Sequence, residues 1–233
     1  MRWRRTIGLA LVLALSGCTE AIGPTGEQEV QVTVRVVNGA FRASNSATAS
    51  PRASAATTVV IESAVFVLGG LKLETAGLDS TVDWVFEASV VVPLDLTGTP
   101  TLAFDTDVPP GVYKELEVSV DKLEVGNAAE EPLITDWPDL ADASVLVTGT
   151  VTVDGGSPVA FTFAAALDID LELLFDAPIS FTAGDDGLTL VSLVIDRSGW
   201  FYGVEGMLNP SDPANRSVIE SNIQASIELQ YDD

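Results

Sequence analysis

The stretch VPPGVYKELEVSVDKLEVG (residues 108–126) decides the predicted fold. Pro109-Pro110-Gly111 is typical of a tight turn, because proline fixes φ and glycine accepts conformations closed to other residues. Apolar and polar residues then alternate, as in a half-buried β-strand. The apolar positions that we expect on one face are Val112, Leu116, Val118 and Val120. After Asp121 the alternation shifts by one residue, which flips the faces of a strand, and we predict a β-bulge there.

Similar short segments recur along the chain and predict further strands. EVQVTVRVV (29–37) alternates strictly, with Val30, Val32, Val34 and Val36 on one face. DGGSP (154–158) separates two alternating runs and predicts a hairpin. The segment 188–195 is apolar on both faces, which favours a central strand. The other predicted strands are 58–68, 71–74 after a turn at Gly69-Gly70, 90–96, 101–104, 144–153, 159–165, 168–175 and 179–182.

The remaining segments are predicted to be loops, with one helix at the end of the chain. Residues 40–57 are rich in Ala, Ser and Thr without apolar periodicity, and we expect a flexible loop. Residues 127–143 are also expected to form a loop. From Ser217, isoleucines recur every three to four residues, with Glu220 placed as in a capping box, which predicts an amphipathic helix at about 217–229. We therefore predict an all-β fold, a single antiparallel β-sandwich over residues 29–233 with a C-terminal amphipathic helix.

The N-terminus RWRRTIGLALVLALSGCTE (2–20) has the features of an export signal. Three arginines precede an apolar run, Ile7 to Leu15, which is about half the roughly 20 residues that a membrane-spanning helix needs. Leu15-Ser16-Gly17-Cys18 closes the run and contains the only cysteine. The segment resembles a bacterial lipoprotein signal peptide. The resemblance implies removal of residues 1–17, diacylglycerol on the Cys18 sulfur, and a tether over 18–28.

This resemblance also predicts where the protein lies. A lipid on Cys18 would anchor the chain to a membrane and leave no thiol for a disulfide or for catalysis. Thr19 follows the cysteine, where Asp would resemble an inner-membrane retention signal, so the outer membrane is favoured. We expect a protein of the cell envelope, either periplasmic or exposed at the surface.

The charge of the chain restricts its partners. The full sequence carries a net charge of −23, and without residues 1–17 its 8 basic and 34 acidic residues give −26. Nucleic acid is not an expected partner, because no basic stripe exists to neutralise phosphates. A protein or glycan partner remains open, as does weak binding of Ca²⁺.

The sequence contains no recognisable catalytic motif. The absence of histidine removes the commonest general base and zinc ligand, and with them the Ser-His-Asp scheme. We expect no enzyme activity, and we assign no catalytic, cofactor or metal-ligating residue. We expect no cofactor.

Carboxylates and aromatic rings provide weaker candidates. Asp168, Asp170 and Glu172 should share one face of a strand, as a solvated outer face, a Ca²⁺ site or a glycosidase pair. The remaining acidic candidates are the pairs Asp105/Asp107 and Asp185/Asp186. The adjacent Trp200, Phe201 and Tyr202 either expose a ring to a sugar or peptide, or cap the sandwich and brace the final helix.

A second resemblance concerns the body of the chain. Pro110-Gly111-Val112-Tyr113, leading into the alternating strand through Val125, is similar to a turn in a group of uncharacterised bacterial lipoproteins with an N-terminal β-sandwich. That group has no agreed activity, so the resemblance implies fold and location only. The sequence thus predicts a lipid-anchored envelope protein of non-catalytic binding or scaffolding type. The alternatives are a calcium-dependent carbohydrate-binding module and a subunit of an envelope complex.

Overall fold

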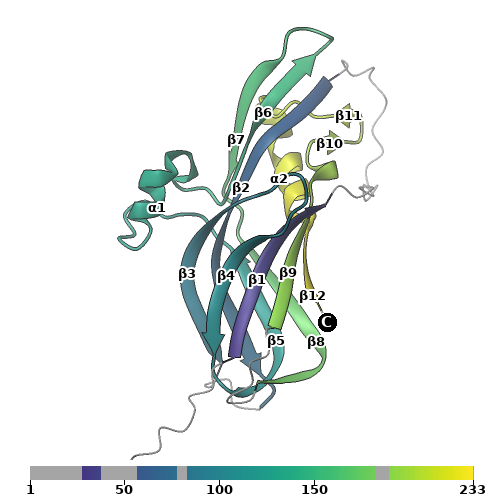
Figure 1. The fold of residues 1–233 in the computed structure, drawn as a ribbon. Helices are drawn as coiled ribbons and strands as arrows, with labels where there is room; N and C mark the ends of the chain where they lie inside the picture. Colours follow the sequence, from purple (N-terminus) through teal and green to yellow (C-terminus); the bar gives the residue numbers. More distant parts are fainter. Residues whose placement is uncertain (1–27, 38–56, 78–82, 182–188, 233) are drawn as a thin grey trace, which may run out of the picture.

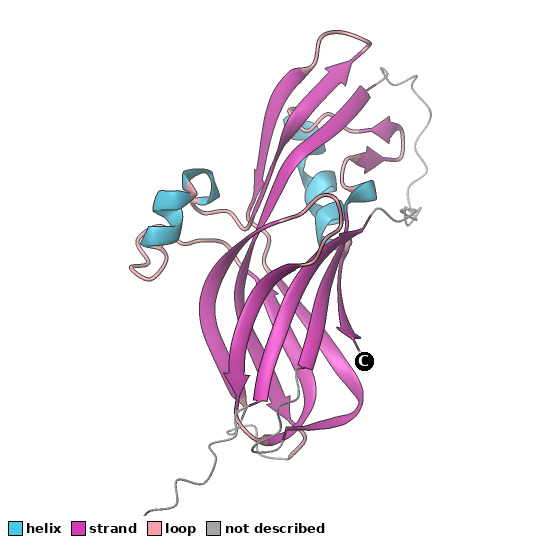
Figure 2. Ribbon diagram, in the orientation of Figure 1, coloured by secondary structure: helices cyan, strands magenta, loops and turns pink. Residues whose placement is uncertain are grey.

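The structure is a computed structural model that describes residues 28–37, 57–77, 83–181 and 189–232. The loop predicted over 40–57 lies outside these ranges except for its last residue, and the turn around Asp185/Asp186 lies outside them as well. The described chain is built mostly of strands, which confirms the all-β prediction (Figure 2).

Two sheets pack face to face in the lower part of Figure 1. The four-stranded sheet, sheet A, has the order β12-β9-β1-β4, and the six-stranded sheet, sheet B, has the order β7-β6-β2-β5-β8, with β3 paired to β2. The strands of sheet A are β12 (Ile227–Asp232), β9 (Thr189–Asp196), β1 (Gln28–Val37) and β4 (Thr101–Val108). The strands of sheet B are β7 (Val159–Ala165), β6 (Val145–Val153), β2 (Thr57–Thr75), β5 (Gly111–Val120), β8 (Ile169–Phe181) and β3 (Trp84–Pro93).

The core lies between these sheets and follows the alternation of the sequence. Val30, Val32, Val34 and Val36 of β1 are all buried, as predicted. β9 lies between β1 and β12 and is the predicted central strand, although it runs parallel to β1 whereas all other strand pairs are antiparallel. The sandwich prediction is confirmed, with this one parallel pair as an addition.

β2 is a single strand of 19 residues, and the predicted turn at Gly69-Gly70 is wrong. The two glycines instead form an irregularity in the register between Leu68 and Gly70, after which the strand continues. At about 3.3 Å per residue, β2 spans roughly 60 Å. The strand therefore runs along both the sandwich and the region beyond it.

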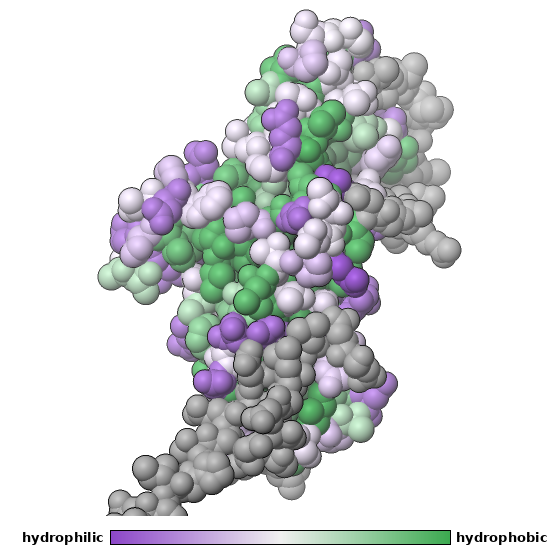
Figure 3. Space-filling model, viewed as in Figure 1, coloured by the Kyte–Doolittle hydropathy of each residue, from purple (hydrophilic) through white to green (hydrophobic). Residues whose placement is uncertain are grey.

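That region is a three-stranded extension, which we call the finger: β6, β7 and residues 57–66 of β2 (upper part of Figure 1). One face packs on the residues after β9, where Phe201 lies against Phe161 and Phe163. Its only charged residues are Glu62 and Asp154. Figure 3 accordingly shows mostly pale and green atoms over the finger. The hairpin predicted at residues 154–158 is confirmed and forms its tip.

The start of β5 differs from the prediction. Tyr113, not Val112, points into the core, and Val112 is 47% exposed. The register of β5 shifts between Tyr113 and Glu115, so the faces flip early in the strand and Leu116 is again buried. The bulge predicted near Asp121 is wrong, because β5 ends at Val120 and Leu123 forms only an isolated bridge to Ala141.

Other boundaries also differ. The two predicted strands 168–175 and 179–182 are replaced by one strand, β8, which runs from Ile169 to Phe181, and β3 begins earlier than the predicted 90–96. The predicted loop 127–143 contains the helix α1 (Glu131–Asp136) and a 3-10 turn, Pro138–Leu140. Short elements not predicted are β10 (Tyr202–Gly203), β11 (Gly206–Met207) and the 3-10 turns Arg197–Gly199 and Pro213–Asn215.

The C-terminal helix is present but is shorter than predicted. α2 (Arg216–Gln224) buries Ile219 and Ile223, and Asn215 rather than Ser217 precedes it, without a side-chain cap. Residues 227–229, predicted as helix, belong to β12, where Ile227 and Leu229 point inward at a spacing of two. Buried residues are four positions apart in α2 and two positions apart in β12, and this change in spacing marks the boundary between the helix and the strand.

We predict that Tyr113→Phe destabilises the protein by about 1 kcal/mol. The Tyr113 hydroxyl donates a hydrogen bond of 3.0 Å to the Pro109 carbonyl and closes the turn into β5. Urea unfolding monitored by circular dichroism measures the change. Tyr202→Phe, at an exposed ring, is the control, and an equal loss in both variants would contradict a role for the hydrogen bond.

We predict that Gly149→Ala destabilises the finger by roughly 1–3 kcal/mol, the usual range for overpacking. A Cβ at Gly149 would lie 2.0 Å from the carbonyl oxygen of Val60 on the neighbouring strand, so the backbone must move. Thermal unfolding of this variant is compared with Thr150→Ala, one residue further along β6. A Gly149→Ala protein as stable as the Thr150→Ala protein would refute the close approach.

Candidate functional site

The acidic strand predicted at residues 168–172 lies on the outer face of sheet B. Asp168, Asp170 and Glu172 are all exposed, while Ile169 is buried on the opposite face. The three acids therefore share one solvated face, as the alternation predicted, with Asp168 directly before β8 and Asp170 and Glu172 within it. This is the arrangement expected of an outer face that contacts water.

Neighbouring strands extend this row into a charged surface, which we call the acidic ladder. In the strand registers, Glu117 of β5 lies opposite both Lys72 of β2 and Glu172 of β8, and Ser119 lies opposite Asp170. Two ion pairs cross from β2 to β5. They join Lys72 Nζ to Glu117 Oε2 at 3.2 Å and Lys114 Nζ to Glu74 Oε1 at 2.8 Å. The ladder consists of Glu74, Glu115, Glu117, Asp170 and Glu172 with Lys72 and Lys114.

The ladder shifts the proton affinities of its members in opposite directions. The hydrogen bond to Glu117 raises the pKa of Lys72, and the hydrogen bond from Lys114 lowers the pKa of Glu74. Partial desolvation, followed by the neighbouring carboxylates, raises the pKa of Asp170 and of Glu115 above the ordinary values. Asp170 and Glu115 therefore destabilise the folded state slightly when ionised, first because the charged form loses water on folding and second because like charges on adjacent strands repel.

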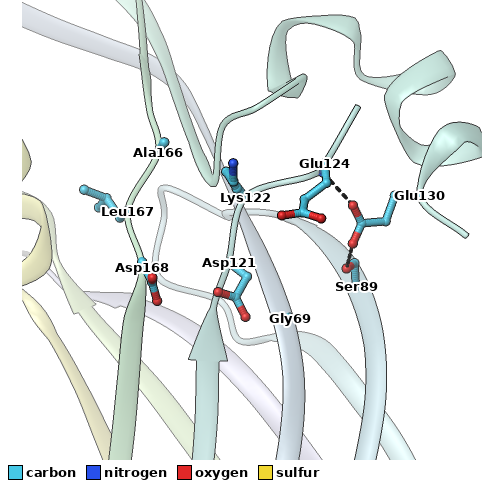
Figure 4. A pocket seen from close by; sticks show the side chains of 9 residues that line it. All are labelled: Gly69, Ser89, Asp121, Lys122, Glu124, Glu130, Ala166, Leu167 and Asp168. Atoms are coloured by element: carbon cyan, nitrogen blue, oxygen red, sulfur yellow. Dashed lines mark hydrogen bonds between the residues drawn. The ribbon is translucent and has the colours of Figure 1, made fainter. Parts of the chain in front are cut away.

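A hollow of about 550 Å³ adjoins the upper end of the ladder (Figure 4). Asp121 and Asp168 line it, and Glu124 and Glu130 lie on its other side. Glu130 is held in place there, since it accepts a 2.7 Å hydrogen bond from the Ser89 hydroxyl and another from the backbone N–H of Glu124. The hollow also owes its shape to Gly69, whose missing Cβ would lie 2.2 Å from Asp121 Oδ2.

The acids of this surface do not form a recognisable metal centre. Among the described residues, no three His, Cys, Asp or Glu side chains gather closely enough to hold a metal ion. Asp105 and Asp107 are exposed on β4, in sheet A, and so are not brought together with the acids of β8. Asp185 and Asp186 lie outside the described residues. The charged groups here can form hydrogen bonds with a ligand, and they attract cations weakly.

The aromatic triplet is mostly part of the core. Trp200 and Phe201 are buried and only Tyr202 is exposed. The Trp200 indole N–H donates a 2.8 Å hydrogen bond to the Ser226 hydroxyl, which in turn donates to the Ile223 carbonyl. These rings cap the sandwich and brace α2, so of the two predicted interpretations the structural one fits.

The cations of the ladder and one apolar surface were not predicted from the sequence. Lys72 and Glu117 meet only because β2 and β5 pair, and a separation of 45 positions along the chain makes this contact invisible in the sequence. Leu174, Phe175 and Tyr231 form an exposed apolar surface between the edges of the two sheets. The adjacent residues Leu173, Leu174 and Phe175 break the alternation of β8. This break in the sequence could have predicted the exposed apolar surface.

Cys18, the predicted site of lipid attachment, lies outside the described residues. Within the described part of the chain, no helix is both long enough and apolar enough to cross a membrane. Comparisons of the chain with protein-family models, with curated proteins and with solved structures found no match.

We predict that Asp170→Asn stabilises the protein at pH 7 by roughly 0.2–1 kcal/mol, the range of cross-strand charge effects. The raised pKa of Asp170 means that folding favours its protonated form. That contribution is complete below the unfolded-state pKa of about 3.9 and is lost as the pH rises through the folded-state pKa. The gain from Asn should therefore be largest near neutral pH and vanish on acidification to about pH 3.5.

Urea unfolding of both proteins at the two pH values measures this gain. Asp105→Asn, an exposed acid in the other sheet, is the matched control. A loss of stability in Asp170→Asn at neutral pH, or the same gain in both variants, would show that the desolvation and repulsion of the Asp170 carboxylate within the ladder are not the cause.

Proposed function

We propose that this chain is a lipid-anchored protein of the cell envelope with a non-catalytic binding or scaffolding role. The observation that carries the proposal is the sequence Leu15-Ser16-Gly17-Cys18 at the end of a basic and apolar export signal. Two or more acyl chains on Cys18 would give stable attachment to a bilayer. With Thr19 after the cysteine, we place the protein at the outer membrane.

The architecture supports such a role. The chain enters the sandwich at Gln28, which pairs with Val108 at the end opposite the finger (Figure 1). Because β2 runs from the finger to this end, a tether at Gln28 would leave the finger tip roughly 60 Å away. The finger carries few charges and β7 is its edge strand, with one side unpaired among the described strands. Such an edge accepts an added strand from a protein partner.

A binding role also fits the chemistry of the side chains. The chain has no histidine, and its single thiol is the proposed site of lipid attachment. The carboxylates of the acidic ladder are spread along three strands and are partly neutralised by Lys72 and Lys114. The ligand of this protein is therefore sought among envelope proteins and glycans.

We predict that Cys18→Ser releases the protein from the membrane. The substitution removes the sulfur to which the lipid would be bonded, and the acidic body has no affinity of its own for anionic bilayers. Fractionation of cells that express the full chain, with intact-mass analysis of the membrane-bound protein, measures both attachment and acylation.

Thr19→Ser, which keeps the cysteine, is the control and should stay in the membrane fraction. Recovery of Cys18→Ser with the membranes, together with a native mass that lacks acyl groups, would refute the anchor.

A further inference from the structure

An apolar surface that no other described segment covers lies on the side of the sandwich, near the end where the chain enters. We call it the β8 patch, and it consists of Leu174, Phe175, Ala177, Pro178, Ile179 and Tyr231. Leu174 is 69% exposed and Tyr231 is 38% exposed. The patch surrounds a hollow of about 490 Å³.

A large bulge in β8 creates this surface. Leu174 lies opposite Glu115 of β5, and Ile179 lies opposite Tyr113, so residues 175–178 face a single residue of the partner strand. The surplus residues project from the sheet edge, with Ala177 and Pro178 exposed. Phe175 points the other way and meets Tyr231 of β12 edge to face, with ring centroids 5.8 Å apart. The bulge thus links the edges of the two sheets by an apolar contact.

We infer that the β8 patch rests on the bilayer to which Cys18 is anchored, and this inference rests on the proposed function. Nine residues separate Cys18 from Gln28, and a fully extended segment of this length spans about 30 Å at most. Gln28 pairs with Val108, one turn before Gly111, and Gly111 pairs with Phe181 at the end of β8. The tether and the patch therefore lie at the same end of the molecule, and the tether holds the patch within reach of the lipid.

The chemistry of the patch favours a bilayer over a second copy of the chain. Leucine, phenylalanine and tyrosine are typical of surfaces that enter the boundary between headgroups and acyl chains. The exposed Asp176 lines the same hollow as the patch, and Glu115 and Glu172 lie beside Leu174. In a twofold dimer the same patch meets itself, which would bring these acids together. A bilayer of zwitterionic lipid imposes no such repulsion.

The test uses the lipidated full chain in phosphatidylcholine vesicles. Ala177→Cys is labelled with the environment-sensitive dye NBD, since acylation of Cys18 leaves the new thiol as the only reactive one. NBD at residue 177 should brighten and shift to shorter wavelength when vesicles are added. NBD on Gly156→Cys, at the finger tip, should not respond.

Two further variants separate the patch from the anchor. Leu174→Ser combined with labelled Ala177→Cys should lose the NBD response while flotation with the vesicles is unchanged. Val204→Ser, which replaces an equally exposed residue (66%) outside the patch, should keep the response. Vesicles containing phosphatidylglycerol should weaken it, because the acids around the patch repel anionic lipid.

The outcomes distinguish the two proposals. Flotation without any response at residue 177, or equal responses at residues 177 and 156, overturns the β8 patch and leaves the anchor standing. A response that requires no vesicles and grows with protein concentration overturns it in favour of self-association. A chain that does not float with vesicles at all refutes the anchor, and the inference falls with it.

Discussion

The continuity of β2 is the constraint on which the rest of the structure depends. Its first half pairs with β6 and its second half pairs with β5 and β3, so one strand belongs to both the finger and the sandwich. A turn at Gly69-Gly70 would have ended the sheet there. The strand instead continues through the two glycines. The carboxylate of Asp121 occupies the space that a side chain at Gly69 would need. The molecule is therefore elongated, with its two ends different in chemistry.

Charged residues are distributed unevenly between these two ends of the molecule. The acidic ladder covers the outer face of the sandwich, where Lys72 and Lys114 neutralise part of it and where Asp170 and Glu115 keep raised pKa values. The finger carries only Glu62 and Asp154. Because strong net charge opposes close approach between like molecules, a weakly charged finger is the part of the described surface best suited to meet an acidic or neutral partner.

The candidate site could be predicted only in part. The alternation Asp168, Asp170, Glu172 placed three acids on one outer face correctly, since the period of a strand is a local property. The cations that pair with the neighbouring acids could not be predicted, because cross-strand neighbours depend on the register between distant segments. The β8 patch was missed for a related reason. Its bulge exists only relative to β5, and Tyr231 comes from the last strand of the chain.

Local residue patterns were enough to predict the class of fold, the inward face of β1, the β6–β7 hairpin and the helical spacing of Ile219 and Ile223. The sequence also contains Leu15-Ser16-Gly17-Cys18, on which the proposed anchoring depends. Only the tertiary structure decided that Tyr113 rather than Val112 enters the core, that β2 continues past its glycines, and that Ile227 begins a strand. The physical reason is that alternation reports which residues can share a face, whereas bulges and strand ends are set by hydrogen bonds to a partner strand far along the chain.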